Sequence, residues 1–497
     1  MTTTSAGVTT VEFQPESRLY IDGELRASAS GATVTNVNPA TEEPLGLATD
    51  AGAEDMDAAI AAARRAFDVT KWSTDRAFRQ HCLQQLHAAL QDEKEQIRAE
   101  LIAEVGAPLT ATYLAQLDWP LADAIRYPAE LIGNFAWERM LDEDAKLGTP
   151  YNRVVIKEPM GVVAAITPWN FPFEIISNKL GQILATGNTV ILKPAMETPW
   201  SGLRWGRIIA EKTDIPPGVV NIVPASDNSI AEMLVTDARV DMVSFTGSTS
   251  VGAQIQRLSA DTMKRNMLEL GGKSAYLVLD DADMSTALAG CVGALMHSGQ
   301  GCALTTRMLV PRSYYDEAVE TASAIVADVG VGDPTDATNF CGPLISGKQR
   351  DRVLEYIEIG QQEGARITVG GGRPEGLQRG YFVSPTVFAD VSPHMRIFNE
   401  EIFGPVLTIT PYDGDDAAVE LANDSTYGLA GTVIGSTERA LDIARRIRTG
   451  SVMVNDSIWY GADAPFGGYK RSGVGRQNGI EGFEQHLQTK VISYPKG

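Results

Sequence analysis

Cysteine is scarce in this chain, and the spacing of the few that exist excludes two common uses of the residue. They are Cys82, Cys291, Cys302 and Cys341, in a chain of 497 residues. No pair forms a C-x-x-C motif and no histidine cluster lies near them, so neither a zinc site nor a disulfide framework is expected. Reduced thiols in a cytoplasmic enzyme fit this pattern best.

Long apolar runs and an excess of basic residues are also missing. No stretch reaches the roughly 18 successive apolar residues that a transmembrane helix needs. Residues 1–20 have neither a basic region nor an apolar one, so we expect no signal peptide. Lys and Arg number 42 against 63 Asp and Glu, a net charge of −21. Such an acidic surface argues against nucleic acid or an anionic membrane as a partner.

What the sequence does contain is a regular alternation of apolar strands and helices. A chain of this length is too long for one core, so two or three domains are expected. We predict strands over residues 161–168, 189–195, 219–225 and 240–248, with helices between them, and a second such run from residue 274 to about 460. This rhythm is typical of parallel sheets covered by helices, and two α/β domains would then meet near residue 270.

Two elements near the start are predicted from local pattern. The stretch LYIDGELRAS alternates around Asp22 and Gly23 and indicates a hairpin. Residues 53–69, AEDMDAAIAAARRAFDV, are rich in Ala, with acids in the first turn, and indicate an amphipathic helix.

The setting of Cys302 suggests a nucleophile. It lies in HSGQGCALTTR, with Gly299 and Gly301 close before it and Ala303 after it. Structural cysteines usually sit among bulky apolar neighbours, whereas small residues would let another molecule approach the sulfur. The stretch alone does not decide between the two.

Three further residues or turns stand where chemistry would need them, each with a plainer alternative. Asn170 lies between two prolines at the end of a strand and could aim its amide at an oxyanion, or it could cap the next helix. Glu269, in an apolar stretch before two glycines, should have a raised pKa and could act as a general base, or be a partly exposed acid. Gly247 and Gly252 open a helix after a strand, as phosphate-binding turns do, but many such turns bind nothing.

Seven strings taken together resemble the aldehyde dehydrogenase superfamily along nearly the whole chain. In order they are Pro-Trp-Asn-Phe, Lys-Pro-Ala, Phe-Thr-Gly-Ser, Glu-Leu-Gly-Gly-Lys, Gly-Gln-x-Cys, Glu-Ile-Phe-Gly-Pro and Pro-Phe-Gly-Gly-Tyr-Lys. The resemblance implies an NAD(P)-dependent enzyme that oxidises an aldehyde to a carboxylic acid through a thiohemiacetal and a thioester on Cys302. Asn170 and the Cys302 backbone N–H would hold the oxyanion, and Glu269 would activate the hydrolytic water.

The same resemblance implies the binding residues. Those for the coenzyme are Ile166, Thr167, Pro168, Trp169, Lys193, Met196, Gly247, Ser248, Gly252, Leu270, Glu401 and Phe403. Those for the substrate pocket are Phe171, Asn178, Met296, Tyr460 and Phe466. Most of the pocket residues are apolar or aromatic, with no Arg or Lys to pair with a carboxylate, which favours a neutral aliphatic or aromatic aldehyde.

Met196 departs from the family pattern, because many members that prefer NAD carry a Glu there. Met offers neither hydrogen bonds to the adenosine ribose nor repulsion of a 2′-phosphate. Glu197 should point to the opposite face of the strand end and not replace it fully. We therefore expect NAD as coenzyme, with NADP also accepted.

The resemblance also implies a fold and an assembly. The expected class is α/β, with two Rossmann-like parallel-sheet domains and a small β oligomerisation element. The coenzyme-binding domain would span residues 1–137 and 160–269, the catalytic domain 270–470, and the oligomerisation element 138–159 and 484–497. We expect a homodimer or a tetramer made of two dimers.

Other functions stay open at this point. Acylating members of the family pass the thioester to coenzyme A, but they generally lack the base found here as Glu269. A cysteine hydrolase could use His297, but it would need a third group to orient that imidazole. A binding protein on the same scaffold would not need Cys302, Glu269 and Asn170 together.

Overall fold

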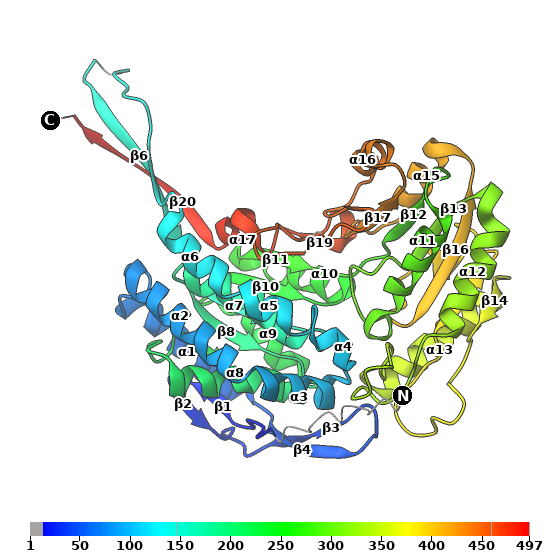
Figure 1. The fold of residues 1–497 in the computed structure, drawn as a ribbon. Helices are drawn as coiled ribbons and strands as arrows, with labels where there is room; N and C mark the ends of the chain where they lie inside the picture. The colour runs from blue at the N-terminus through cyan, green and yellow to red at the C-terminus, as the bar shows by residue number, and fades with distance from the viewer. Residues whose placement is uncertain (1–12, 147, 459, 497) are drawn as a thin grey trace, which may run out of the picture.

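Two large sheets and a projecting arm organise the protein, as a computed structural model shows (Figure 1). The structure describes residues 13–146, 148–458 and 460–496. The predicted domain spans include residues 1–12, 147, 459 and 497, which lie outside the described residues. The α/β class with parallel sheets is confirmed.

The first sheet has eight strands in the order β19-β11-β10-β7-β8-β9-β1-β2. The five strands from β11 to β9 run parallel, and β19, β1 and β2 extend the sheet in antiparallel pairings. The strands are β1 (Leu19–Ile21), β2 (Glu24–Arg26), β7 (Val162–Ile166), β8 (Thr189–Lys193), β9 (Val220–Ile222), β10 (Met242–Thr246), β11 (Arg265–Glu269) and β19 (Gly473–Val474).

Most elements of this sheet match the sequence predictions. The four predicted strands contain β7, β8, β9 and β10, and the hairpin is β1–β2, whose turn residues Asp22 and Gly23 both have positive φ. The predicted Ala-rich helix is α1 (Ala53–Val69), with the same bounds. The strand β11 was not predicted, because it opens on the polar pair Arg265 and Asn266 and has no long apolar run.

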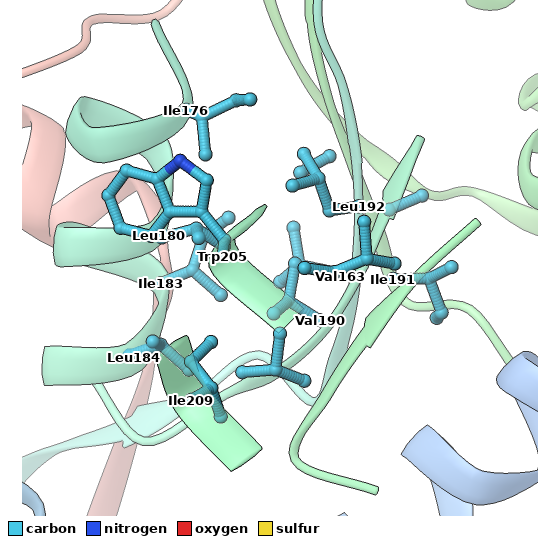
Figure 2. Close-up of a cluster of buried hydrophobic side chains, with 14 of the residues drawn as sticks. Val163, Ile176, Leu180, Ile183, Leu184, Val190, Ile191, Leu192, Trp205 and Ile209 are labelled. Carbon is cyan, nitrogen blue, oxygen red and sulfur yellow. The ribbon is translucent and has the colours of Figure 1, made fainter. Parts of the chain in front are cut away.

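Apolar side chains from two helices fill the space above the first sheet (Figure 2). The helices are α7 (Pro172–Ala185) and α8 (Pro199–Lys212). Leu180 and Ile183 of α7 and Trp205 of α8 point toward Val163 and Val190 on the strands, and all are nearly or fully buried. Burial of each such side chain contributes about 1.5–3 kcal/mol, so the sheet is a rigid base for the strand ends described below.

The second sheet has seven strands in the order β14-β15-β16-β13-β12-β17-β18. All neighbours run parallel except β14 and β15. The strands are β12 (Ala275–Val278), β13 (Arg307–Pro311), β14 (Arg366–Val369), β15 (Thr386–Ala389), β16 (Val406–Tyr412), β17 (Gly431–Ile434) and β18 (Met453–Val454).

An arm of three antiparallel strands extends away from the body (Figure 1). They are β5 (Glu138–Met140), β6 (Tyr151–Pro159) and β20 (Leu487–Pro495). β20 pairs with β6 along its whole length, from Leu487 opposite Pro159 to Pro495 opposite Tyr151. Val491, Ile492 and Tyr494 on β20 are exposed, so this edge strand carries apolar side chains into solvent.

The other elements are mostly helices that cover the sheets. They are β3 (Thr33–Val37) and β4 (Pro44–Thr49), α2 (Arg76–Asp92), α3 (Lys94–Val105), α4 (Leu109–Thr112), α5 (Asp118–Asp123), α6 (Arg126–Asn134), α9 (Asn228–Thr236), α10 (Thr249–Leu258), η1 (Ala260–Thr262), α11 (Met284–Ala289), η2 (Gly290–Gly299), η3 (Arg312–Tyr314), α12 (Tyr315–Ala327), α13 (Gly347–Gln362), α14 (Arg396–Asn399), α15 (Gly414–Asn423), α16 (Thr437–Arg446), η4 (Lys470–Ser472) and α17 (Gly479–Gln485). Among the described residues, no helix is long and apolar enough to cross a bilayer.

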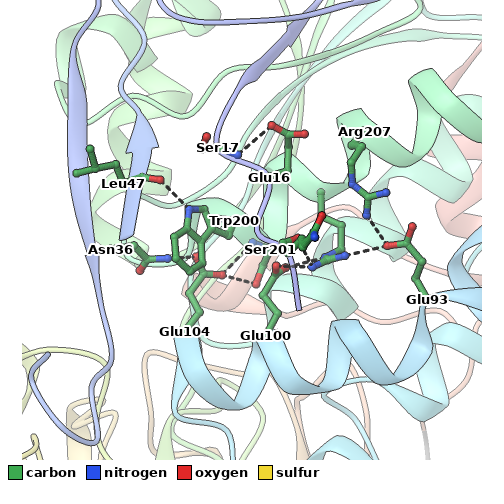
Figure 3. A network of polar contacts seen from close by, with 12 residues as sticks. Glu16, Ser17, Asn36, Leu47, Glu93, Glu100, Glu104, Trp200, Ser201 and Arg207 are labelled. Atoms are coloured by element: carbon green, nitrogen blue, oxygen red, sulfur yellow. Dashed lines mark hydrogen bonds and ion pairs between the residues drawn. The ribbon is translucent and has the colours of Figure 1, made fainter. Parts of the chain in front are cut away.

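A buried polar network ties the N-terminal strands to two helices (Figure 3). The Glu104 carboxylate of α3 accepts hydrogen bonds from Asn36 Nδ2 of β3 at 2.6 Å and from the backbone N–H of Trp200 in α8 at 2.8 Å. One turn before it, Glu100 forms an ion pair with Arg204 at 2.7 Å. Burial, with the charge of Glu100, raises the pKa of Glu104 to about 8. The donors compensate part of the cost of burying this acid.

Candidate active site

The first sheet has a topological switch point at β7. The chain passes from β7 to β8 and β9 on one side, and then returns to place β10 and β11 on the other. In parallel sheets, ligands bind where the strand order reverses, outside the carboxyl ends of the strands. The predicted coenzyme residues Ile166 to Trp169, Lys193, Gly247, Ser248 and Leu270 all lie at or just beyond these ends. Topology therefore brings together segments that are far apart in the sequence.

The turn after β10 is tightly packed, and this explains its glycines. A Cβ on Gly252 would lie 2.5 Å from Leu270 Cδ2, and one on Gly247 would lie 2.4 Å from the Phe245 ring. Ser248 is exposed and is the N-cap of α10, where its Oγ accepts from the Val251 N–H. The free N–H groups of a helix N-terminus favour a bound anion.

Two buried hydroxyl groups at the switch point have unused hydrogen-bonding capacity. Thr167 Oγ1 follows β7 and Thr246 Oγ1 ends β10, and neither has a hydrogen-bond partner among the described residues. Buried hydroxyls normally find partners. A polar ligand lying across the ends of β7 and β10 would supply them, so these residues fit a dinucleotide there.

The surroundings of Met196 differ from the prediction. Strand β8 ends at Lys193, and Met196 and Glu197 lie in the turn before α8. We expected Glu197 to point to the opposite face from Met196 because neighbours in a strand alternate. Neither residue belongs to a strand, so that reason does not apply. Burial lowers the pKa of Lys193, while the charge of Glu197 acts on that ammonium group in the opposite direction. Glu197 is therefore close enough to influence the same position.

Glu401 and Phe403 precede β16 of the second sheet and contact segments that follow strands of the first sheet. The Gly272 N–H donates to Glu401 Oε1 at 2.9 Å, and a Cβ on Gly271 would lie 2.4 Å from Oε2. The Phe403 ring packs edge-on against Trp169, with centroids 5.5 Å apart. Burial raises the pKa of Glu401 to about 7. These contacts fix the Glu401 carboxylate beyond the end of β11 and the Phe403 ring beyond the end of β7.

Cys302 borders a cavity of about 860 Å³, and it is the partly exposed cysteine. The other three, Cys82, Cys291 and Cys341, are buried and free. The cavity wall near the sulfur includes Gly301 and Ala303, as the small residues around Cys302 suggested.

The loop that carries Cys302 has an unusual backbone. His297, Ser298 and Gly299 all have positive φ, and a Cβ on Gly299 would lie 2.0 Å from the Gly404 carbonyl oxygen. Gln300 is fully buried and anchors the loop: its Oε1 accepts from the Ile345 N–H at 3.0 Å, and its Nε2 donates to the carbonyls of His297 and Pro343. Sequence reasoning noted Gln300 only as a neighbour of the glycines and missed this role.

Asn170 is held against the same loop. Its Nδ2 donates to the Gln300 carbonyl oxygen at 2.9 Å, two residues before Cys302. Gln116 Nε2 donates to the Asn170 backbone carbonyl at 2.8 Å. The helix that follows, α7, has no side-chain cap from its N-cap residue Phe171. The Asn170 amide is thus held against the loop that carries Cys302, and it does not cap α7.

Glu269 is buried at the end of β11, three residues before Gly272, which lets the chain pass close to Cys302. A Cβ on Gly272 would lie 2.3 Å from the Cys302 carbonyl oxygen. Both carboxylate oxygens of Glu269 lack a hydrogen-bond partner among the described residues. Burial raises the pKa of Glu269 well above its usual range, against the charge of Lys179, as the sequence predicted for this acid. A carboxyl group in that state can accept a proton near neutral pH.

Two charged residues of α7, Lys179 and Glu174, also influence the pKa values of Glu269 and Cys302. Lys179 donates to Ser244 Oγ at 3.0 Å, and burial lowers its pKa to about 7. Burial lifts the pKa of Cys302 well above its usual range, with contributions from Glu269, Glu401 and Glu174. The thiol is therefore protonated in the free protein. Sequence reasoning missed both Lys179 and Glu174, which look like ordinary charges of a helix.

The cavity brings together most of the predicted pocket residues. Phe171, Met296, Tyr460 and Phe466 line it together with Cys302. Asn178 does not line the cavity. Its Nδ2 donates to the carboxylate of Glu174, and Glu174 does line the cavity. Among the described residues of the lining there is no Lys, Arg or His.

His297 is unsuited to activate Cys302. Its imidazole is fully buried and packs edge-on against Phe171, with ring centroids 5.4 Å apart. Burial lowers the pKa of His297 to about 4, so the ring is neutral. It is not among the described residues that line the cavity. Nor, in the described ranges, do three or more His, Cys, Asp or Glu side chains gather as a metal site would require.

Comparisons with known proteins agree on one family. The model of the aldehyde dehydrogenase family matches residues 26–492. A 3-succinoylsemialdehyde-pyridine dehydrogenase of a Pseudomonas species is 42% identical over 95% of this chain and 97% of its own.

Two solved structures are also similar along the whole chain. Aldehyde dehydrogenase C of Pseudomonas syringae, a cysteine-to-alanine mutant with NAD+ and octanal, has a TM-score of 0.92 and 37% identity, and the match covers 97% of this chain and 98% of that one. Betaine aldehyde dehydrogenase of Staphylococcus aureus with NAD+ has a TM-score of 0.93 and 34% identity, over 96% and 94% of the two chains.

Proposed function

Since the chain belongs to the aldehyde dehydrogenase family and is an oxidoreductase that acts on aldehydes, we propose that it uses NAD and forms a covalent intermediate on Cys302. The observation that carries this proposal is the position of Cys302, which borders the large cavity while a buried carboxylate and a fixed amide approach the same loop. Two similar structures hold NAD+.

In this proposal the coenzyme would bind at the carboxyl ends of β7 and β10. Ser248 and the start of α10 would hold the pyrophosphate, Lys193 the adenosine ribose, and Glu401 with Phe403 the nicotinamide riboside. When bound, the oxidised nicotinamide would accept a hydride, a proton with two electrons, from the substrate, and its positive charge would favour the thiolate. The unpartnered hydroxyls of Thr167 and Thr246 support this position.

Cys302 begins the reaction in this mechanism. Its thiolate attacks the carbonyl carbon, a C–S bond forms, and the π electrons move to oxygen. Asn170 Nδ2 and the Cys302 N–H stabilise that oxyanion, and each such donor is typically worth about 3–4 kcal/mol. When the oxyanion collapses, the C–H bond breaks and a thioester to Cys302 remains.

Glu269 completes the turnover. It takes a proton from a water molecule, the water oxygen attacks the thioester carbon, and the C–S bond breaks to return the thiolate and release the carboxylic acid. Its raised pKa suits proton acceptance near neutral pH. Lys179, which influences the pKa of Glu269, keeps part of that charge balanced.

The remaining proposals concern substrate, domains and assembly. The lining favours aldehydes without a carboxylate, and the neutral side chain of Met196 supports acceptance of NADP beside NAD. The two large sheets and the three-stranded arm support the division of the chain into coenzyme-binding, catalytic and oligomerisation parts, although β19 of the first sheet lies outside the predicted spans. Exposed apolar residues on β20 support a homodimer or a tetramer, and four free thiols are compatible with the cytoplasm.

A cysteine variant tests the proposal directly. Cys302→Ala should abolish formation of NADH from aldehyde and NAD, because no thioester can form, while NAD binding by titration stays nearly intact. Cys291→Ala, a buried thiol outside the proposed chemistry, is the matched control and keeps activity. Alkylation and mass mapping should identify Cys302 as the reactive thiol. If Cys82, Cys291 or Cys341 proves to be the essential one, the proposal is wrong.

A further inference from the structure

A carboxylate lies in the wall of the otherwise largely apolar and aromatic part of the cavity nearest Cys302. Glu174 belongs to the first turn of α7, four residues after Asn170, and it lines the cavity together with Cys302, Phe171 and Trp119. A buried acid costs free energy unless its position is used or compensated. The proposed reaction gives Glu174 no role.

The Glu174 carboxylate is held on one side only. Asn178 Nδ2 and Tyr460 Oη both donate to Oε1, the latter at 3.3 Å. The Tyr460 ring packs on Trp119, with centroids 5.9 Å apart. Among the residues that the structure describes, Oε2 has no hydrogen-bond partner, and it is not one of the buried unpartnered atoms. One carboxylate oxygen is thus fixed, and the other is accessible from the cavity.

Glu174 is also electrostatically close to the reacting groups. Its charge contributes to the raised pKa of Cys302 and to that of Glu269, in each case after the effect of burial. A ligand whose carbonyl carbon meets the sulfur could therefore place a second group at Glu174 after a short chain.

The cavity as a whole favours a positive or donating group. Besides Glu174, three exposed carboxylates line it, those of Asp281, Asp283 and Asp456, and no basic residue is present in its described lining. The rings of Trp119, Phe171 and Tyr460 belong to the same wall. Aromatic faces beside a carboxylate are a favourable setting for an ammonium group.

We propose that Glu174 selects aldehydes that carry a hydrogen-bond donor, an ammonium or a hydroxyl group, separated from the carbonyl by a short chain. The donor binds Oε2 of Glu174 while the carbonyl carbon lies at Cys302 Sγ. This inference rests on the proposed function, because it assumes that the aldehyde reacts at Cys302. Glu174 is a specificity residue here and takes part in no bond-making step.

Three aldehydes of equal size test the proposal. They are 3-aminopropanal, 3-hydroxypropanal and butanal, assayed with saturating NAD. In the parent protein, kcat/KM for the amino or the hydroxy compound should exceed that for butanal by about 10- to 100-fold, the range expected for a hydrogen bond to a charged group. A preference for the amine alone identifies an ammonium site, and a preference for both identifies a general donor site.

Variants of Glu174 then assign the preference to this residue. Glu174→Gln should bring the ratio of kcat/KM values toward one, mainly through KM of the donor-bearing substrate. Glu174→Asp should keep part of the ratio, because the charge is retained. Glu130→Gln, at an exposed acid of α6 paired with Arg126, should leave the ratio unchanged.

Two results would overturn the proposal. One is equal kcat/KM for the three aldehydes in the parent protein. The other is an equal loss for all three in Glu174→Gln, which would show that Glu174 only supports Tyr460. In both cases NADH still forms, so the proposed function stands. If none of the three aldehydes yields NADH, both proposals fail.

Discussion

Glu269 is a residue whose surroundings decide its chemistry. Its two carboxylate oxygens have no partners among the described residues, and burial raises its pKa. Such a buried carboxyl group lacks hydrogen-bond partners, and a water molecule beside it would supply one. Its buried neighbour Lys179, whose own pKa is lowered to about 7 by burial, acts against that rise.

Glu269→Gln should separate the two halves of the reaction. The amide keeps the shape but cannot accept a proton, so rapid mixing should show a burst of NADH followed by slow turnover. In the parent, the rate of thioester hydrolysis should rise with pH through the raised pKa of Glu269, because the base acts when deprotonated, and the variant should lose that rise. Unchanged steady-state turnover in Glu269→Gln would remove this residue from the mechanism.

Met196 should set the choice of coenzyme. Met196→Glu places a carboxylate near the expected ribose, where it repels a 2′-phosphate by about 1–3 kcal/mol. The ratio of kcat/KM for NAD to that for NADP should rise accordingly. Glu197→Gln is the comparison, since Glu197 influences Lys193. If Glu197→Gln alone changes the ratio, Glu197 and not Met196 faces the ribose.

At the scale of elements, the loop before Cys302 depends on one side chain. The Gln300 side chain forms hydrogen bonds with three backbone groups, and its backbone carbonyl accepts a hydrogen bond from Asn170 Nδ2. Three successive residues with positive φ precede it. Such a backbone persists only where surrounding contacts hold it.

Gln300→Ala should therefore reduce both stability and activity. Buried backbone groups of Ile345, His297 and Pro343 would lose their partner, at a cost of about 3 kcal/mol or more in total. The melting temperature should fall, and kcat should fall because Cys302 and Asn170 no longer share a fixed loop. Gln361→Ala, at an exposed site of α13, is the control. A Gln300→Ala protein that melts earlier yet keeps its kcat would contradict this role for the loop.

Pattern predicted the elements better than it predicted the site. The apolar strands β7, β8, β9 and β10 and the helix α1 follow from composition and period alone. β11 was not predicted because its first residues are polar. The role of Glu174 was not predicted because an acid in the first turn of a helix is ordinary, and only the folded chain shows that it lines a cavity. The error at Glu197 came from extending strand geometry four residues past the end of β8.

At the scale of the whole molecule, the three-stranded arm stands out because a single chain leaves its apolar side chains exposed to solvent. β20 is an edge strand of a three-stranded sheet and exposes Val491, Ile492 and Tyr494. Exposed edge strands pair readily with other chains.

Val491→Lys should weaken self-association. Light scattering at micromolar concentration should give the mass of a dimer or tetramer for the parent and a smaller mass for the variant, because a lysine on an edge strand opposes pairing. Leu441→Lys, at another exposed apolar residue on α16, should keep the parent mass. A monomeric parent would refute the proposed assembly, and an unchanged mass in Val491→Lys would place the interface elsewhere.

The acids around Cys302 have a consequence for the durability of the protein. One cysteine sulfur borders open space and the other three are buried, so Cys302 is the cysteine that peroxide can reach. A protonated thiol reacts slowly with peroxide, and the raised pKa of Cys302 keeps it protonated in the empty site. Burial, and after it the nearby carboxylates, thus lowers the reactivity of the Cys302 sulfur toward oxidants while no ligand is bound.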